Sequence, residues 1–268
     1  MLDIRVERCF LLVGLANPPV NALSLLLRRE LYDAITRTAC GSGIEAVIVY
    51  GTGRCFCAGG DLRELGSPAN HATPRLSIDV LPAVEACGKP VIAALHGAAV
   101  GGGFELALAC HYRIATENTR LSLPEVQHGI IPLSGTQRLP RVWGVHRALD
   151  LMLNSRELNA GAFADSAVFD QIVTDGDVLT AAIEFAHALV ERKLTAAQHA
   201  AHLIRNRPHL EADPQKALID SAVLCSNLVG AQRAVFAAVR AGVEAGDFDA
   251  GLATAQHLFN ALAGTLGR

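Results

Sequence analysis

The sequence predicts an α/β fold in which short strands run into glycine turns that open onto helices. Three observations favour this class. Runs rich in β-branched residues alternate with helical runs as far as about Gly144, glycine clusters follow the strand-like runs, and the chain beyond is Ala-rich and helical in pattern. An alternation of strands and helices is typical of α/β proteins.

The elements of the first half can be justified in order. The N-terminal fifteen residues alternate as a strand does, and 9–15 and 44–51 are β-branched-rich runs bounded by Gly or polar residues. Between them, 24–40 has apolar residues at helical spacing and starts with a Ser, a preferred N-cap. We then expect a strand, a helix directly after three glycines, and a fourth strand, in the segments 89–97, 104–110 and 111–123.

The second half is predicted to be almost entirely helical. Its one strand-like run is 169–173, and its helical runs are 146–155, 175–193, 195–206, 213–228, 230–246 and 248–264. Several of these helices are apolar on more than one face, which favours packing against another subunit. We therefore divide the chain into a core, residues 1–194, for binding and catalysis, and a helical oligomerisation region, residues 195–268.

Composition limits the classes of function. With 51% hydrophobic and 18% charged residues the chain is globular, and a net charge of -3 offers no basic footprint for nucleic acid or a membrane surface. The apolar run near residue 100 contains Gly clusters, His96 and Glu105, so it is a poor membrane span. The seven cysteines lack zinc-like spacing, and no targeting peptide precedes the first strand pattern, so we expect reduced thiols and a cytoplasmic location.

Two glycine turns in the middle of the chain can expose backbone N–H groups. One is Ala58-Gly59-Gly60, followed by Asp61, which we interpret as a helix N-terminal residue. The other is the Gly101–Gly103 triplet, where unpaired N–H groups meet the positive end of a helix dipole. Each turn alone has a plainer interpretation, a tight turn in the first and close helix–strand packing in the second. Together they predict two donors for one carbonyl oxygen.

Two carboxylates lie close to these turns in the sequence. Glu105 stands in an almost wholly apolar run, where burying a carboxylate is costly unless something pairs with it or uses it. Glu125 follows Pro124, a position that also suits an ordinary residue of a first helical turn. Two donors and two carboxylates suit a reaction that polarises a carbonyl group and moves protons at neighbouring carbons.

Four segments in this order resemble the enoyl-CoA hydratase/isomerase, or crotonase, superfamily: "NPPVNAL" (17–23), "FCAGGDL" (56–62), "KPVIAALHGAAVGGGFELALAC" (89–110) and "LSLPEV…GIIP…GTQRLPR" (121–141). The match runs through about residues 5–175, and the first motif and "FDAGLATAQHLFNAL" further resemble the hydratase part of multifunctional fatty-acid β-oxidation enzymes. The resemblance implies a crotonase-like spiral of repeated ββα units with a helical C-terminal region, assembled as a homotrimer or a dimer of trimers.

The resemblance also implies an acyl-CoA substrate, with no cofactor beyond the coenzyme A of that substrate and no metal. The thioester oxygen would bind the N–H groups of Gly60 and Gly102. Glu105 would activate a water, and Glu125 would supply the proton to C2 of a trans-2-enoyl thioester, giving a 3-hydroxyacyl-CoA. The residues expected to line the substrate site are Ala58, Gly60, Asp61, Leu62, Arg63, Gly102, Pro124 and Leu133.

Two alternatives stay open at this point. One is a Δ3-Δ2-enoyl-CoA isomerase, since the multifunctional relatives use the same two carboxylates for both reactions. The other is a catalytically weak paralogue that binds acyl-CoA, suggested by a turn at Leu133–Gly135 one residue shorter than in the family. His128 is either a polar pocket residue or a tolerated substitution. The loop 66–77 is expected to be a mobile surface loop, and is either a plain connection or a lid or pocket wall. Acyl chain length and the choice between trimer and hexamer are not predicted.

Overall fold

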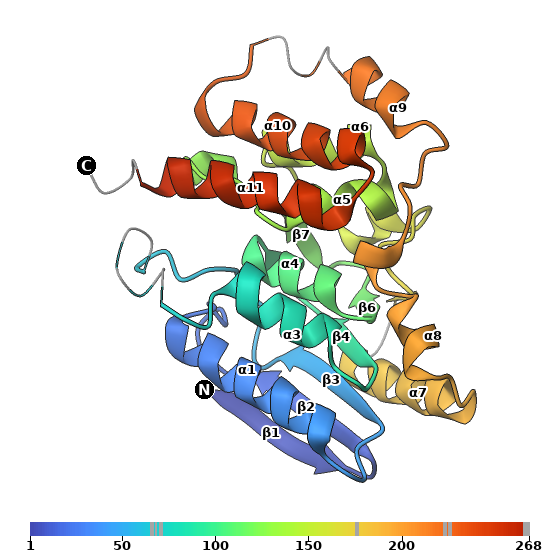
Figure 1. Ribbon diagram of the computed structural model, residues 1–268. Helices are drawn as coiled ribbons and strands as arrows, with labels where there is room; N and C mark the ends of the chain where they lie inside the picture. Colours follow the sequence, from blue (N-terminus) through green and yellow to red (C-terminus); the bar gives the residue numbers. More distant parts are fainter. Residues whose placement is uncertain are drawn as a thin grey trace.

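The computed structural model describes residues 1–64, 67, 69, 72–174, 177–221, 224 and 227–264, and contains two β-sheets with helices around them (Figure 1). The larger sheet has the strand order β1-β2-β3-β4-β6-β9. Its strands are β1 Leu2–Glu7, β2 Phe10–Leu15, β3 Ala46–Gly51, β4 Val91–Leu95, β6 Tyr112–Thr116 and β9 Gln171–Val173. Only β1 and β2 pair antiparallel, so the other neighbours need crossover connections.

The smaller sheet contains β5 Ala98–Val100, β7 Arg120–Ser122 and β8 Glu157–Asn159. Strand β4 continues into β5 in this second sheet and then into helix α4, Gly102–Ala109, and β6 likewise continues into β7. Successive turns of the chain therefore add one strand to each sheet, which is the predicted spiral of ββα units. The strand expected within 111–123 is confirmed as β6, and a turn after it leads to a further strand, β7, in the smaller sheet.

The central strands are buried on both faces. Along β2, Leu11 and Val13 face one hydrophobic cluster, and Phe10 and Leu12 face another. Such alternation follows from the two-residue period of a strand. The second cluster is covered by helix α7, Val178–Glu191, through side chains at helical spacing: Val178, Ala182, Ala186 and Leu189. The first cluster lies toward α1, Leu25–Cys40, and the helices that carry the pocket described below.

The remaining helical segments are η1 Leu76–Val80, α3 Leu81–Glu85, η2 Glu125–His128, α5 Gly135–Trp143, α6 Val145–Leu153, η3 Ala160–Phe163, α8 Ala196–Ala200, η4 Ile204–Asn206, α9 Pro214–Asp220, α10 Gly230–Ala245 and α11 Phe248–Ala263. The single helix expected at 195–206 is wrong, because the segment forms α8 and the separate turn η4. Of the helix expected at 213–228, the part after Ser221 falls mostly outside the described residues.

The C-terminal helices α10 and α11 form an antiparallel pair that packs on α5 and α6 (Figure 1). Gln137 of α5 lies at their crossing, where a methyl group on Gly242 or Gly251 would collide with its Oε1. Glycine is therefore required on both helices for α5 to approach. Within the described residues, no helix is long and apolar enough to cross a membrane. The division into residues 1–194 and 195–268 stays a prediction.

Candidate active site

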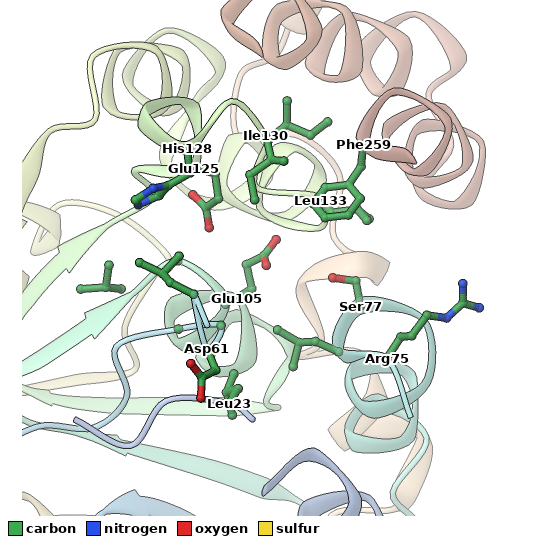
Figure 2. Close-up of a pocket in the computed structure, with 18 of the residues that line it drawn as sticks. Leu23, Asp61, Arg75, Ser77, Glu105, Glu125, His128, Ile130, Leu133 and Phe259 are labelled. Carbon is green, nitrogen blue, oxygen red and sulfur yellow. The ribbon is translucent and has the colours of Figure 1, made fainter. Parts of the chain in front are cut away.

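One pocket of about 300 Å³ lies where the first ββα turns meet η2 and α11. Both carboxylates singled out in the sequence line it, and so do Gly60 and Gly102. Five further residues expected at the substrate site line it too: Ala58, Asp61, Leu62, Pro124 and Leu133. Figure 2 shows Glu105 reaching the pocket from below and Glu125 from above, with Leu133 and Phe259 beside them.

The two glycine turns are brought together by backbone pairing. Cys57 forms a parallel bridge with Ala99 of β5, so the turn after residue 57 lies against the turn before α4. A methyl group on Gly102 would lie 3.5 Å from Gly60 N, so the two amides are neighbours. Gly59 has φ +90°, and a methyl group there would lie 2.5 Å from Val100 O. Glycine is thus required at position 59, whereas Gly60 has open space beside it.

The amides of Gly60 and Gly102 are both available as donors. Gly102 is the first residue of α4, so its N–H has no acceptor within the helix. Among the described residues, neither amide donates to a backbone acceptor elsewhere in the chain. Two N–H groups from separate turns therefore border the same cavity, and the N-terminal end of α4 adds its positive dipole there.

Glu105 lies one turn into α4 and is 4% exposed. Its Oε1 accepts three hydrogen bonds, from Ser134 N at 2.7 Å, Ser134 Oγ at 3.0 Å and Gly135 N at 2.7 Å. These donors belong to the turn that leads into α5. The short Leu133–Gly135 turn therefore holds Glu105 directly.

Glu125 is the first residue of η2 and has few protein partners. A methyl group on Gly101 would lie 2.8 Å from Glu125 Oε1, so the carboxyl group lies over the glycine turn. The residue is half-buried as a whole, but its Oε2 is shut off from solvent and has no partner among the described residues. Burial, followed by the nearby Glu105 charge, raises the pKa of Glu125 well above its ordinary value of 4.5. Its protonated form is thereby favoured.

Asp61 and Arg63 differ from expectation in detail. Asp61 leads into a turn over Leu62–Glu64, so its interpretation as a helix N-terminal residue is wrong. Its carboxylate instead binds the Arg63 guanidinium at 2.7 and 2.9 Å, and this hydrogen bonding is the main reason that the pKa of Asp61 is lowered. The Arg63 side chain is 84% exposed and lies outside the pocket lining, so its role at the substrate site stays a prediction.

Several residues that line the pocket, or contact a side chain that does, were not predicted from the sequence. Ser134 contacts Glu105, and the sequence pointed to it only as part of the shorter Leu133–Gly135 turn. Gln256, Phe259 and Asn260 reach the pocket from α11. Local pattern could not reveal them, because they lie more than a hundred positions from the catalytic segments. His128 lines the pocket as well, which favours the first of its two interpretations.

The loop 66–77 is described only in part. Gly66, Pro68, Asn70 and His71 lie outside the described residues, so its predicted mobility is not addressed. Its last described residues, Arg75 to Ser77, form a wall of the pocket. This part of the loop therefore agrees with the pocket-wall interpretation.

A second buried acidic group lies outside the pocket. Glu85 of α3 binds Arg138 at 2.6 Å through Oε1 and Arg205 at 2.9 Å through Oε2. The guanidinium groups of Arg138 and Arg205 both lie over the ring of Phe248, at 5.0 and 5.1 Å from its centroid. In the described part of the chain, no group of three or more His, Cys, Asp or Glu side chains is arranged to hold a metal ion.

Comparison with known proteins places the chain in a family. The family model for enoyl-CoA hydratase/isomerase matches residues 6–245. The peroxisomal bifunctional enzyme of Danio rerio is 43% identical over 192 residues, 71% of this chain, and that of Homo sapiens is 33% identical over 257 residues, 95% of this chain. These alignments span only 26% and 35% of the two relatives.

Solved structures agree with this assignment. The crystal structure of an enoyl-CoA hydratase from Polaromonas sp. JS666 superposes with a TM-score of 0.65 at 27% sequence identity, covering 87% of this chain and 88% of that one. Its fold is thus shared along most of both chains. The chain belongs to the enoyl-CoA hydratase/isomerase family, with the crotonase fold.

Proposed function

We propose that the protein is an enoyl-CoA hydratase, which adds water across the double bond of a trans-2-enoyl-CoA to give a 3-hydroxyacyl-CoA. The observation that carries the proposal is the meeting of two buried carboxylates and two free glycine amides at one cavity. Relatives named for enoyl-CoA hydratase or peroxisomal bifunctional activity support it.

In the proposed mechanism the amides of Gly60 and Gly102 donate to the thioester oxygen. Water does not add to an unactivated alkene at neutral pH, but an enoyl thioester is electrophilic at C3. As the water oxygen bonds to C3, negative charge moves onto the thioester oxygen. Donors already in place stabilise that charge, and loss of one such donor typically costs about 10²–10³-fold in rate.

The two carboxylates take different parts in proton transfer. Glu105, held by three donors on Oε1, acts as the base that removes a proton from the attacking water. Among the described residues, no donor binds Glu125 Oε2, and burial raises the pKa of Glu125, so it carries the proton that is delivered to C2. The reaction needs only water and these two side chains, and no cofactor besides the coenzyme A of the substrate.

We further propose the assembly and location that the sequence suggested, a homotrimer or dimer of trimers in the cytoplasm. Exposed apolar side chains in the C-terminal region, Leu210, Ile219 and Val229, support packing against another copy. Buried free thiols at Cys55, Cys57 and Cys110 support a reducing compartment. Size-exclusion chromatography with light scattering and localisation of a tagged full chain test these two points.

The function is tested by following the enoyl absorbance of crotonyl-CoA and of longer trans-2-enoyl-CoAs with purified protein. Loss of absorbance with formation of the 3-hydroxyacyl-CoA is expected. A protein that shifts the double bond of a Δ3-enoyl-CoA without hydrating trans-2 substrates would be an isomerase instead. Binding of acyl-CoA without turnover at any chain length would make it a catalytically weak paralogue.

A further inference from the structure

Ser134 occupies a position where serine ordinarily caps its own helix. It is the N-cap residue of α5, and an N-cap serine typically accepts a hydrogen bond from an N–H in the first turn. Here the side chain makes no such bond. The hydroxyl donates instead to Glu105 Oε1, 29 residues away in the sequence, while Glu105 accepts from the backbone N–H groups of Ser134 and Gly135.

Glu105 therefore acts as the cap of α5 from outside the helix. A carboxylate at a helix N-terminus is stabilised by free N–H groups and by the helix dipole, and hydrogen bonds to an ionised group are stronger than neutral ones. The Ser134 hydroxyl adds a third donor to the same oxygen. Among the described residues Glu105 Oε2 has no protein donor, so this oxygen is the one left for a water in the pocket.

The first turn of α5 is tied to α10 through Gln137, whose Nε2 donates to Ala238 O at 2.9 Å. The Thr136 hydroxyl donates within its own turn, to Leu133 O at 2.8 Å. Ser134, Thr136 and Gln137 are all buried. Gln137 lies against Gly242 of α10 and Gly251 of α11. A movement of α5 away from Glu105 would therefore disturb the packing of these two helices.

We propose that Ser134 is a positioning residue for the reaction: its hydroxyl, together with the two backbone donors, holds Oε1 of Glu105 and orients the free oxygen of Glu105 toward the attacking water. The inference rests on the proposed hydratase function. It makes the altered Leu133–Gly135 turn part of the catalytic arrangement, with a side-chain donor that a glycine in this turn would lack.

Other charged groups face this carboxylate but do not replace the Ser134 donor. Glu125 of η2 lines the same pocket as Glu105, and the Glu105 charge contributes to the raised pKa of Glu125. Charged or titratable side chains elsewhere on the pocket wall are Arg28, Asp61, Arg75 and His128. The elements packed against α4 and α5 also carry Glu85, Arg138, Arg141 and Arg205, of which Glu85, Arg138 and Arg205 are engaged with one another.

The test compares variants of Ser134 with a matched change in the same turn. Ser134→Ala and Ser134→Gly remove the hydroxyl and keep both backbone donors, whereas Ser134→Thr keeps a hydroxyl. Thr136→Ala is the control, because it removes a buried hydroxyl from the same turn that does not touch Glu105. For each protein, the pH profile of kcat/KM for crotonyl-CoA and the separate values of kcat and KM are measured.

The Ala and Gly variants are expected to lower kcat about tenfold, with KM within about twofold, and to move the acid limb of the profile to higher pH. Ser134→Thr is expected to restore the limb, and Thr136→Ala to leave it in place. The proposal is overturned if the limb stays in place without the Ser134 hydroxyl, if Ser134→Thr behaves as Ser134→Ala, or if Thr136→Ala moves it equally.

A measurement without turnover separates this inference from the proposed function. In protein labelled with ¹³C at the glutamate carboxyl carbons, the Glu105 signal is identified by its loss in Glu105→Gln, and its chemical shift is compared by NMR between the wild type, Ser134→Ala and Thr136→Ala. A chemical shift that changes in Ser134→Ala but not in Thr136→Ala supports the inference even if the wild type fails to hydrate crotonyl-CoA. An unchanged chemical shift in Ser134→Ala contradicts it even if the protein is a hydratase.

Discussion

Two buried acidic sites in this protein use the same side chain for opposite purposes. Glu85 is enclosed by Arg138 and Arg205, so each of its oxygens has a cationic partner. Glu105 and Glu125 share a pocket, and the negative charge of Glu105 disfavours a second negative charge on Glu125. The difference teaches that burial alone does not mark a catalytic carboxylate. A buried carboxylate without a cation beside it is a candidate for proton transfer, whereas one held between two arginines belongs to an ion-pair cluster.

The two sites also differ in what they do for stability. Removing one partner of a buried ion pair leaves an uncompensated charge, which is strongly destabilising. The pocket pair has no such partner to lose, and Glu125 Oε2 is already without one among the described residues. We therefore expect substitutions in the pocket pair to abolish activity and spare the fold, and substitutions in the Glu85 cluster to do the reverse.

The largest expected effect is on catalysis. Glu105→Gln and Glu125→Gln should each lower kcat for crotonyl-CoA by about 10²–10⁴-fold, because each removes a general acid or base. Thermal unfolding should show that both variants remain folded. Glu157→Gln is the control, since Glu157 pairs with Arg120 at the surface, and its turnover should stay near that of the wild type. Full turnover in either pocket variant would contradict the two-carboxylate mechanism.

The next effect is on stability. Glu85→Ala should lower the free energy of unfolding by about 3–5 kcal/mol, because Arg138 stays buried without its counterion. Urea denaturation monitored by circular dichroism gives this value. The folded fraction should still hydrate crotonyl-CoA with a KM near that of the wild type. A change below about 1 kcal/mol would show that the cluster does not stabilise the fold as described.

A smaller effect appears in the pH dependence of stability. The pKa of Glu125 is raised in the folded state, so the folded state binds its proton more tightly than the unfolded chain does. Its contribution to stability is fully present below the unfolded value and is lost as pH rises through the folded value. Relative to Glu125→Gln, the wild type should lose up to about 1.4 kcal/mol per pH unit in that window.

This prediction is checked by urea denaturation of both proteins at a series of pH values upward from pH 4. Using the difference between the two proteins removes the contributions of the titrating groups that do not interact with Glu125. Curves that run parallel across the whole range would mean that Glu125 titrates in the folded protein as it does in the unfolded chain.

The smallest effect is expected at the outer arginine of the Glu85 cluster. Arg205→Gln should cost about 1 kcal/mol or less, because Arg205 is 26% exposed and Glu85 keeps its bond to Arg138. Urea denaturation of Arg205→Gln and Glu85→Ala under the same conditions shows which substitution lowers the free energy of unfolding more. If Arg205→Gln costs as much as Glu85→Ala, the outer arginine matters more than its exposure implies.

The features that the sequence predicted well are local ones. Strands β2, β3 and β4 and helices α1 and α4 lie where β-branched runs and helical spacing indicated them. Glu105 attracted attention because a carboxylate in an apolar run is unusual whatever the fold. The pocket lining contains most of the residues that the motifs suggested, because the bridge between Cys57 and Ala99 of β5 brings the two glycine turns together.

The features that were missed depend on contacts between distant segments. Helix α5 was not predicted, since Gly135 and Pro140 are poor helix formers, and tertiary packing around Gln137 outweighs their propensity. The approach of Ser134 to Glu105 and of Phe259 to the pocket depends on how α5 and α11 pack. Periodicity carries no information on such pairs, so a sequence without an alignment could not reveal them.

The most direct test of hydration by Glu105 and Glu125 is to measure the origin of the hydroxyl oxygen in the product. Crotonyl-CoA is incubated with the wild-type protein in H₂¹⁸O, and the product is analysed by mass spectrometry. Addition of water at C3 gives 3-hydroxybutyryl-CoA that carries one ¹⁸O on C3. We expect Glu105→Gln and Glu125→Gln to form this product far more slowly. Conversion without incorporation of ¹⁸O, or equal incorporation rates in the wild type and both variants, would contradict hydration by these two carboxylates.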